Sequence, residues 1–436
     1  MTKPLRVGIA GLGNVGCGVV KILQQYPDMI AARAGRPVEI VCVSARDANK
    51  DRGIDISAYE WLDSPERMAG DPRLDVVIEL MGGAEGTARN LVERCLKAGK
   101  PVITANKALL AEHGLELAAM ADSSVVPLLY EAAVAGGIPI IKTLREGFAG
   151  NQINAIYGIL NGTCNYILTE MRETGRAFDD VLKEAQQKGY AEADPSFDVD
   201  GIDAAHKLSI LSALAFGVKP DFSKVDIQGI RHITADDIAC ATQLGYRIKL
   251  LGMARRVADG RIVQRMEPCL VPEHSPIGAV DGVYNAVLIE GNFVGSSLLV
   301  GRGAGEGPTA SAVLSDIVDV ARHLDKPLAG RPVYGIPALE LEDAVWGGPE
   351  DILAHFYIRL SVLDKPGVLA DVTAILRDHK ISVESVIQRG RSPDQPVSII
   401  LSTHESRQSD VVAACSGIAD LDLVRAEPTV MRIVQF

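Results

Sequence analysis

Residues 5–26 read LRVGIAGLGNVGCGVVKILQQY, and this stretch decides the fold of the N-terminal third. A short β-branched run is followed by three glycines in GxGxxG spacing and then by an amphipathic helix. In that context the glycines make a tight turn, let the backbone approach a pyrophosphate, and allow the helix to pack closely on the strand. The spacing therefore predicts a dinucleotide site at the helix N-terminus. The residues expected to hold the cofactor there are Gly11, Leu12, Gly13, Asn14, Val15 and Gly16.

The following segments alternate between strands and helices. DVVIELMGG, residues 75–83, reads as a buried strand, and ARNLVERCLKAGKPVITANK, residues 88–107, reads as a helix, a glycine stop and another strand. This alternation predicts an α/β fold with a Rossmann-type doubly wound parallel sheet. Ligands of such sheets bind beyond the carboxyl ends of the strands, so Thr104, Asn106 and Lys107 are expected at the cofactor.

The residues after the strand VEIVCVS, residues 38–44, indicate which cofactor is bound. An isolated acidic side chain there would bind the 2′-hydroxyl of NAD, but Arg46 and Lys50 follow the strand instead. Cations at this place suit the 2′-phosphate of NADP. We therefore expect NADP, with NAD possible because Asp47 lies between the two cations.

The composition excludes several classes of protein. The chain has 436 residues, of which 47% are hydrophobic and 23% charged, as in soluble globular proteins with room for two or three domains. The 44 basic and 56 acidic residues give a net charge of −12, which argues against nucleic acid or an anionic membrane as a partner. Neither a membrane span nor a signal-peptide core is evident, so a cytoplasmic location is expected. The seven scattered cysteines are expected to be core residues.

A second informative stretch, residues 185–207, reads AQQKGYAEADPSFDVDGIDAAHK. An almost wholly apolar run of helical length begins after Gly201 and predicts a buried helix. Asp203 and Lys207 are four residues apart, so they share one face of this helix. An ordinary surface ion pair would explain them, but a buried ammonium is costly unless paired and is usually kept for a function. We therefore expect Lys207 to be functional.

Two features between these stretches leave their roles open. YEAAVAGGIPIIKTL, residues 130–144, reads as a strand and a glycine-rich turn, whose carbonyl groups, with Glu131, would hold either a monovalent cation or the nicotinamide side of the substrate. Cys164 lies at the predicted N-terminus of a helix, where a thiolate would suit the nucleophile of an aldehyde-oxidising dehydrogenase. No histidine lies near it in the sequence, which argues against that role.

Taken together, the glycine turn, TANK at residues 104–107 and the stretch at residues 185–207 resemble the homoserine dehydrogenase family. That family's signature of Ala, Gly, Asp-Pro, Asp, Gly-x-Asp and a terminal Lys fits the second stretch. The resemblance extends to GRGAGEGPTASAVLSDIV, residues 301–318, which would bring the chain back to the nucleotide domain with Gly305 and Gly307 at the cofactor. It implies NAD(P)-dependent interconversion of L-homoserine and L-aspartate 4-semialdehyde, in the biosynthesis of threonine and methionine.

The resemblance also implies a role for each matching residue. Lys207 would donate and accept the proton at the substrate oxygen, and Lys107 would assist beside the nicotinamide. The residues that would bind the substrate are Glu192, Asp198 and Asp203. The groups that would hold a sodium or potassium ion are Glu131 and the backbone carbonyls of Val134, Gly136 and Ile138.

A Gly/Pro-rich linker precedes a C-terminal module. The module reads strand, turn, helix, strand, with further strands around a second helix, and its turn DKPG resembles the ligand-binding turn of ACT domains. These are ferredoxin-like modules that bind amino acids and usually pair across a subunit interface. The resemblance implies feedback binding of threonine at Asp364, Pro366 and Gly367, although some ACT domains only mediate assembly.

These features predict an order of domains and leave two competing functions. The expected parts are a dinucleotide-binding domain at 1–135 completed by 305–328, an α+β substrate-binding and dimerisation domain at 136–304, a linker at 329–349, and an ACT domain at 350–436. The assembly expected is a homodimer or homotetramer. One alternative is an acylating aldehyde dehydrogenase using Cys164, which leaves the acidic stretch before Lys207 unexplained. The other is a non-enzymatic nucleotide and amino-acid sensor, against which the two intact lysines argue.

Overall fold

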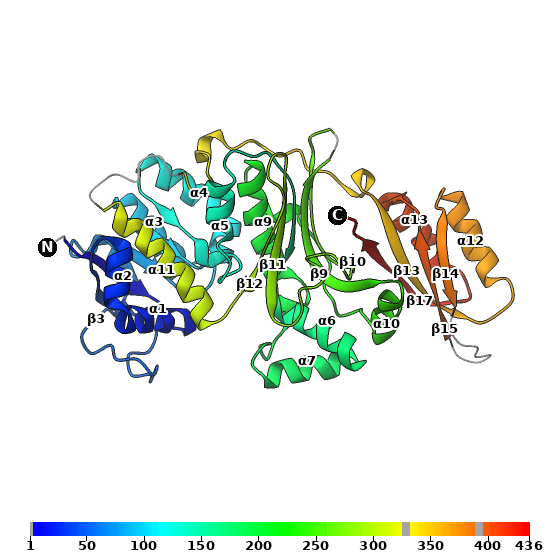
Figure 1. Cartoon of the computed structure of the whole chain (residues 1–436), viewed down its shortest axis with the longest axis horizontal. Coiled ribbons are helices and arrows are strands. Elements are labelled where there is room, and N and C mark those ends of the chain that lie inside the picture. The colour runs from blue at the N-terminus through cyan, green and yellow to red at the C-terminus, as the bar shows by residue number, and fades with distance from the viewer. Residues whose placement is uncertain (1–2, 258, 325–331, 389–395) are drawn as a thin grey trace. The chain divides into compact units, whose positions relative to one another are not determined.

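The chain divides by its internal contacts into two compact units. The computed structural model describes residues 3–257, 259–324, 332–388 and 396–436 (Figure 1). Residues 325–331, which end the segment predicted to complete the nucleotide domain and begin the predicted linker, lie outside the described residues. The first unit consists of Met1–Gly162, Asp203–Val225 and Val283–Ala344, and the second of Thr163–Ile202, Asp226–Gly282 and Val345–Phe436.

A six-stranded parallel sheet forms the framework of the first unit. Its strands are β1 (Leu5–Ala10), β2 (Val38–Ser44), β3 (Glu60–Trp61), β4 (Val76–Glu79), β5 (Val102–Thr104) and β6 (Leu128–Leu129). They lie in the order β3-β2-β1-β4-β5-β6 with every neighbour parallel. This is the strand order of dinucleotide-binding sheets, so the predicted Rossmann-type fold is confirmed. The order reverses between β1 and β4, and ligands of such sheets bind beyond the carboxyl ends of those strands.

Helices connect the strands, and several begin or end at the expected residues. Asn106 caps the fourth helix by accepting the N–H of Leu109 at 3.2 Å, and Gly99 follows the third helix with a φ of 71°. The helices are α1 (Asn14–Gln25), α2 (Pro27–Ala34), α3 (Thr87–Lys97), α4 (Lys107–Ser123), α5 (Ile140–Lys142), α9 (Ile202–Phe216) and α11 (Glu306–Arg322). Shorter helical turns are η1 (Pro65–Gly70), η2 (Glu131–Ala133), η3 (Thr143–Gly147), η4 (Phe222–Lys224) and η5 (Ala338–Glu340).

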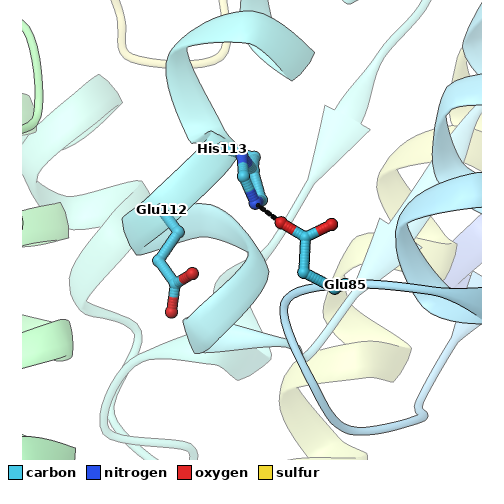
Figure 2. Close-up of side chains that lie close together, drawn as sticks. All are labelled: Glu85, Glu112 and His113. Carbon is cyan, nitrogen blue, oxygen red and sulfur yellow. Dashed lines mark hydrogen bonds and ion pairs between the residues drawn. The ribbon is translucent and has the colours of Figure 1, made fainter.

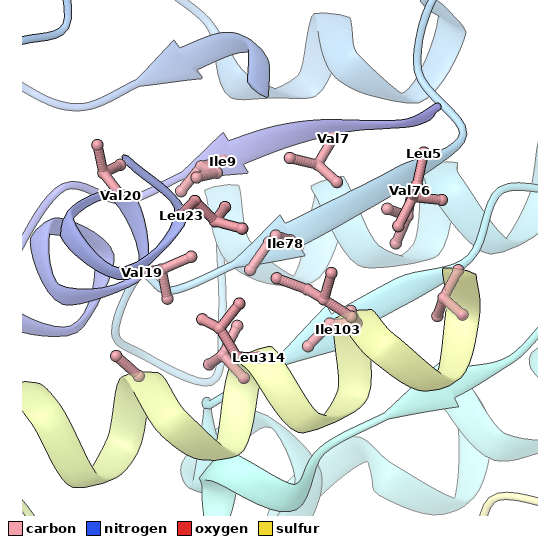
Figure 3. Packing of buried hydrophobic residues seen from close by; sticks show 14 of the residues in the cluster. Leu5, Val7, Ile9, Val19, Val20, Leu23, Val76, Ile78, Ile103 and Leu314 are labelled. Carbon is pink, nitrogen blue, oxygen red and sulfur yellow. The ribbon is translucent and has the colours of Figure 1, made fainter. Parts of the chain in front are cut away.

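The core beside this sheet joins segments from both ends of the first unit. Figure 3 shows Leu5, Val7 and Ile9 of β1 together with Val19 of α1 and Leu314 of α11. The first four side chains are fully buried and Leu314 is 5% exposed. Each such aliphatic side chain contributes roughly 1.5–3 kcal/mol when it is removed from water. Helix α11 therefore belongs to the core beside this sheet, although it lies far from β1 in the sequence.

Two further elements of the first unit lead toward the candidate site. Helix α9 is buried on nearly all sides, as its apolar sequence predicts, and only Ile202 and Ala215 are partly accessible. Strand β11 (Tyr284–Gly291) pairs antiparallel with β7 (Ile153–Ile159) on one side and with β12 (Gly295–Arg302) on the other.

The second unit ends in the predicted ferredoxin-like module. Its helices and strands follow the order β13, α12, β14, β15, α13, β17, which is a βαββαβ arrangement. Within this unit the sheet runs β9-β10-β17-β13-β15-β14, so the hairpin β9–β10 continues the sheet of the module. The strands are β8 (Asp226–Ile227), β9 (Tyr246–Arg256), β10 (Ile262–Pro272), β13 (Leu353–Leu363), β14 (Val383–Gln388), β15 (Pro396–Thr403), β16 (Ser406–Arg407) and β17 (Val424–Ile433). The helices are α6 (Gly162–Thr174), α7 (Phe178–Gln187), α8 (Ser196–Val199), α10 (Ala235–Gln243), η6 (Pro349–Asp351), α12 (Val368–Asp378) and α13 (Gln408–Ala419).

Two further expectations concern membrane spans and cysteines. Among the described residues, no helix combines the length and the apolar character needed to cross a membrane. All seven cysteines are buried, as expected of core residues.

Candidate active site

Two lysines and one aspartate form a cluster in the first unit. Lys207 Nζ lies 2.7 Å from Asp203 Oδ2, and Lys107 Nζ lies 2.8 Å from Asp203 Oδ1. Lys207 also donates to the carbonyl oxygen of Leu160 at 2.8 Å, and Asn161 Nδ2 donates to Asp203 Oδ2 at 2.9 Å. The side chains of Lys207 and Asp203 are 9% and 7% exposed, so they are not an ordinary surface ion pair.

Three elements of the first unit bring these side chains together. Asp203 and Lys207 lie one turn apart on α9, which the four-residue spacing predicts. Lys107 is the first residue of α4, and the Asn106 cap fixes where that helix begins. The segment after β7 supplies Asn161. Its contact with Asp203 was not predicted, because Asn161 reads only as a turn residue in the sequence.

The two ammonium groups keep Asp203 ionised. Burial alone would raise the pKa of this carboxyl group, but the charges of Lys207 and Lys107 oppose that effect and hold the pKa well below its usual range. A single carboxylate between two ammonium groups also offsets their mutual repulsion. The cluster can therefore hold the buried ammonium of Lys207 and the partly exposed ammonium of Lys107 on one carboxylate.

The contacts of Lys207 suit a group that exchanges a proton with a ligand. An ammonium has three N–H donors, and among the described residues Leu160 and Asp203 accept two of them. A neutral amine keeps both of these hydrogen bonds and has a lone pair in the third position. Lys207 can therefore take a proton from an oxygen atom in that position without losing either contact, as a general base requires.

The glycine turn after β1 has the geometry that a dinucleotide requires. Gly11 has a φ of 106°, and a Cβ atom there would lie 2.5 Å from the carbonyl oxygen of Leu80. A Cβ atom at Gly16 would lie 2.0 Å from the carbonyl oxygen of Gly11. A Cβ atom at Gly13, in contrast, would have no heavy atom of the described residues within 4 Å. The turn is thus tightly packed at Gly11 and Gly16 and open at Gly13, where the start of α1 can receive a phosphate.

Cationic side chains follow β2. Arg46 and Lys50 are exposed there. Arg52, which was not predicted, donates from Nε to the carbonyl oxygen of Leu12 at 3.3 Å, and its guanidinium lies over the ring of Trp61, 5.7 Å from the centroid. Arg52 is therefore a third cation after β2, and it contacts the glycine turn directly.

The N-terminus of α11 lies beside α1. Gly305 precedes α11 with a φ of 111°, and a Cβ atom at Gly307 would meet no described heavy atom within 4 Å. A Cβ atom at Gly18 of α1 would lie 2.8 Å from Glu306 Cγ, and Lys21 Nζ lies 2.7 Å from Glu306 Oε1. Gly305 and Gly307 are therefore close to the helix that follows the glycine turn.

The loop around Glu131 begins with a 3-10 turn, whereas a strand was predicted for it. Strand β6 already ends at Leu129, because the backbone N–H of Glu131 is donated to Asp316 Oδ2 at 2.9 Å and not to a neighbouring strand. The buried carboxylate of Glu131 accepts the N–H groups of Ile141 and Lys142, both at 2.9 Å. Burial and the nearby Asp316 raise the pKa of Glu131 to about 7.

The carbonyl groups expected to hold a cation differ in their contacts. Those of Val134 and Gly136 accept no hydrogen bond from the described residues, whereas that of Ile138 accepts the N–H of Ile140 at 2.8 Å. A carbonyl oxygen has two lone pairs, so the bond to Ile140 leaves Ile138 able to bind a cation as well. Oxygen ligands beside two buried carboxylates, Glu131 and Asp316, fit a hard cation.

The other predicted substrate ligands and Cys164 belong to the second unit. Glu192 is exposed between α7 and α8, and Asp198 is half-buried in the first turn of α8. Cys164 is fully buried near the start of α6, and its thiol donates to the carbonyl oxygen of Asp198 at 3.2 Å. Reactive cysteines are partly exposed thiolates, so this geometry argues against the aldehyde dehydrogenase alternative.

Figure 2 shows a further group of side chains of the kinds that bind metals. Glu85, Glu112 and His113 place ligand atoms within 4.8 Å of one another, and His113 Nε2 lies 2.6 Å from Glu85 Oε1. Arg89 Nη1 lies 3.1 Å from His113 Nε2 and 3.2 Å from Glu85 Oε1. Because this guanidinium already supplies the positive charge, we interpret the group as an ion-pair network.

The predicted effector turn lies between β13 and α12. Gly367 has a φ of 101° and directly precedes α12. Gln388 Nε2 donates to Asp364 Oδ1 at 3.4 Å. Asp364, Pro366 and Gly367 thus lie at a helix N-terminus, where backbone amides can bind a carboxylate.

Family models match three consecutive parts of the chain. A model of the NAD-binding domain of homoserine dehydrogenase matches residues 11–131, a homoserine dehydrogenase model matches residues 139–318, and an ACT domain model matches residues 356–414. The homoserine dehydrogenase of Neisseria gonorrhoeae is 43% identical over 432 residues, which cover 99% of each chain. That of Pseudomonas aeruginosa is 46% identical over 427 residues, which cover 95% of this chain and 96% of its own.

Solved structures extend the similarity to the fold. The structure of a homoserine dehydrogenase from Thiobacillus denitrificans has a TM-score of 0.93 and 46% sequence identity, and the match covers 99% of this chain and 98% of that one. A hyperthermophilic archaeal homoserine dehydrogenase mutant, solved in complex with NADPH, has a TM-score of 0.63 and 27% identity and covers 75% of this chain.

Proposed function

Because the chain belongs to the homoserine dehydrogenase family, we propose that its proton transfer runs through the cluster of Lys107, Asp203 and Lys207. The protein is an NAD(P)-dependent homoserine dehydrogenase, which interconverts L-homoserine and L-aspartate 4-semialdehyde. The observation that carries the proposal is the position of Lys207 Nζ, held by Asp203 Oδ2 at 2.7 Å and by the carbonyl oxygen of Leu160 at 2.8 Å. This leaves its third direction for the substrate.

In the direction of oxidation, the neutral amine of Lys207 takes the proton of the substrate hydroxyl group. The C–H bond of the same carbon breaks, and its electron pair leaves as hydride while the carbonyl forms. A nicotinamide held at the glycine turn would supply the acceptor for that hydride, or the hydride itself in reverse. In the direction of reduction, the Lys207 ammonium returns the proton to the oxygen. Lys107, held by the other oxygen of Asp203, stabilises negative charge that develops on the substrate oxygen.

The amino acid end of the substrate is assigned to acidic groups. Glu192 and Asp198 carry the charge that a substrate ammonium requires, and Asp203 borders the reacting oxygen through its two lysines. Alignment of the hydroxyl-bearing carbon with the nicotinamide supplies much of the rate in such a reaction, because no covalent intermediate is needed.

The choice of NADP over NAD is assigned to the cations after β2. Arg46 and Lys50 are exposed there, and Arg52 contacts the glycine turn at Leu12, which supports binding of a 2′-phosphate. We assign Gly305 and Gly307 to the same cofactor because α11 lies beside α1, and Thr104 because it lies at the carboxyl end of β5.

The monovalent cation is assigned to Glu131 and the carbonyl groups of Val134, Gly136 and Ile138. The buried carboxylate and the carbonyls of Val134 and Gly136, which accept no hydrogen bond within the described part of the chain, support this assignment. The ion would be sodium or potassium, since the site offers one charged ligand from the loop itself and otherwise neutral oxygens.

Feedback by threonine is assigned to the turn at residues 364–367. The linker supports a route from the module to the catalytic lysines. Its residue Ala338 donates its N–H to Asp122 Oδ2 of α4 at 2.7 Å, and Val333 accepts the hydroxyl of Tyr130 at 2.8 Å. Glu342 donates its N–H to the carbonyl oxygen of Gly217, just after α9, at 3.2 Å. The linker thus contacts α4, which begins with Lys107, and the end of α9, which carries Lys207.

The remaining assignments concern organisation. We propose the domain bounds 1–135 with 305–328, 136–304, 329–349 and 350–436; the three separate family matches support a nucleotide part, a substrate part and an ACT part in this order. A cytoplasmic homodimer or homotetramer is proposed, since ACT domains usually pair across a subunit interface.

The test is reduced-nicotinamide absorbance on mixing the purified protein with L-homoserine and either NADP or NAD. Reduction with NADP at lower cofactor concentration than with NAD is the expected result. The assay is repeated with sodium, potassium or neither, and with added threonine. Equal use of both cofactors would refute the assignment of Arg46 and Lys50 to the 2′-phosphate of NADP. Isothermal titration that detects no binding of threonine would refute the assignment of residues 364–367 to an effector.

A further inference from the structure

Glu79 is a buried carboxylate at the place where the sheet order reverses. It is the last residue of β4 and is 0% exposed. Its Oε2 accepts the hydroxyl of Thr104 at 2.6 Å, and its Oε1 accepts the N–H of Met81, also at 2.6 Å. Across the sheet its neighbours are Ala10 on β1 and Thr104 on β5. Within the described ranges, no charged side chain contacts it.

Keeping such a group is costly, because a buried carboxylate without a cation loses its hydration and gains no ion pair. Burial raises the pKa of Glu79 to about 7, although the hydrogen bonds from Thr104, Met81 and Asn106 oppose this effect. Perturbed groups of this kind occur mostly at functional sites. Glu79 itself has no access to a ligand, so any function must act through its neighbours.

Its neighbours connect it to the start of α4. Thr104 Oγ1 accepts the N–H of Asn106 at 3.0 Å, so its own proton points to Glu79. The Asn106 side chain accepts the N–H of Leu109 at 3.2 Å and donates to the carbonyl oxygen of Gly83 at 2.7 Å. These bonds tie the loop after β4 to the turn after β5. Lys107 directly follows Asn106 and reaches Asp203 at 2.8 Å.

We propose that Glu79 is a positioning residue for the reaction: through Thr104 and Asn106 its carboxylate holds the start of α4 so that Lys107 meets Asp203. The inference rests on the proposed role of Lys107. It adds a residue that touches neither substrate nor cofactor. Both oxygens of Glu79 accept in this arrangement, one from the N–H of Met81 and one from the hydroxyl of Thr104. A protonated carboxyl group would have to donate where the carboxylate accepts, so the Thr104 hydroxyl would have to turn away and the hold would weaken.

Glu79→Gln tests the proposal, because the amide has the same shape but sets an NH₂ group against Met81 N–H or the Thr104 hydroxyl. We expect kcat to fall about ten- to hundredfold, as for small misplacements of catalytic groups, with the KM for NADP changed by no more than about twofold. Measured in the direction of reduction, where Lys207 acts as its ammonium form, the wild-type kcat should fall as the pH drops through about 7, and this part of the profile should be absent in the variant. Glu79→Asp, which keeps a carboxylate, should recover part of kcat and regain that part of the profile.

Glu93→Gln is the matched control, because Glu93 is a partly buried carboxylate of α3 outside the proposed site, and it should leave kcat and the pH profile unchanged. Thr104→Val is the second variant, in case Glu79→Gln does not fold. It removes the connecting hydroxyl at nearly constant volume and should lower kcat to a similar extent, and the double variant should be no worse than either single one. Circular dichroism establishes that each variant is folded, and NADPH binding is a second check for the Glu79 variants, because Thr104 is itself assigned to the cofactor.

A parallel Lys107→Ala variant separates the two assignments. Lys107→Ala could lose turnover while Glu79→Gln keeps a normal kcat and a normal pH profile. That result would refute the positioning role of Glu79 and leave the role of Lys107 intact. Normal turnover in Lys107→Ala would refute the role of Lys107, and the positioning role with it. A wild-type profile without an acid limb between about pH 6 and 8 would also contradict the proposal, and it requires no substitution.

Discussion

Replacement of Lys207 by methionine tests the candidate site most directly. Methionine fills a similar volume but has no nitrogen, so the proton of the substrate hydroxyl group loses its acceptor. General acid–base catalysis contributes typically about 10²–10⁴-fold, so kcat should fall by that factor, equivalent to roughly 3–5 kcal/mol in the activation barrier. The glycine turn does not depend on Lys207, so NADPH should bind as it does to the wild-type protein.

The same substitution has a calculable effect on stability. Breaking a buried ion pair costs about 3–5 kcal/mol when the remaining charge has no other partner. Here Asp203 keeps Lys107 at 2.8 Å and Asn161 at 2.9 Å, and only the carbonyl oxygen of Leu160 loses its donor. The loss should therefore be nearer the cost of one unsatisfied buried acceptor, about 1–3 kcal/mol.

The assays are homoserine-dependent reduction of NADP, NADPH fluorescence for binding, and urea unfolding for stability. Lys97→Met is the control, because Lys97 is an exposed lysine of α3 with a 62% accessible side chain. A folded Lys207→Met enzyme whose kcat lies within about threefold of the wild-type value would refute the assignment of Lys207 as the proton acceptor. A loss of turnover with an equal loss of NADPH binding would indicate a misfolded site instead.

Three further substitutions test other parts of the molecule. Asp281→Asn should destabilise the protein by about 3–5 kcal/mol in urea unfolding, because the fully buried Lys249 loses its anionic partner at 3.1 Å. Gly114→Ala should lower the free energy of unfolding by roughly 1–3 kcal/mol, since a Cβ atom there would lie 2.2 Å from the Tyr334 hydroxyl. Tyr334→Phe removes that buried hydroxyl, which has no partner among the described residues, so the double variant should recover much of this stability. Gly11→Ala should abolish NADPH binding measured by fluorescence, because its positive φ and the nearby carbonyl leave no room for a side chain.

The fold of the first unit could be predicted because its signals are local. The GxGxxG turn, the apolar strand runs and the glycine after α3 each depend on a few adjacent residues, and together they define a parallel sheet with helical connections. The pairing of Asp203 with Lys207 is local in the same sense, since residues four apart on a helix must share a face. The strand expected at Glu131 was wrong because a distant carboxylate, Asp316, takes its backbone N–H.

The parts that could not be predicted are contacts between distant segments. Nothing in the spacing of Lys107 or Asn161 places either of them on Asp203, because those contacts depend on how α4 and β7 pack beside α9. Arg52 reads as one more loop cation until its contact with the glycine turn is seen. Glu79 had one weak signal, an acidic residue at the end of an apolar strand, but its burial becomes apparent only when Thr104 lies opposite it.

The charge of the cluster explains why two lysines share one carboxylate. With Lys207 neutral, Lys107 and Asp203 cancel, so the site carries no net charge when it is ready to oxidise an alcohol. In the proposed reaction, taking the hydroxyl proton would give Lys207 the positive charge that a nicotinamide ring would lose on accepting hydride. The total charge would then stay constant, which would keep reorganisation around the cluster small. The depressed pKa of Asp203 means that this carboxyl group stays ionised. As a carboxylate, Asp203 can accept a hydrogen bond from Lys207 both as an amine and as an ammonium.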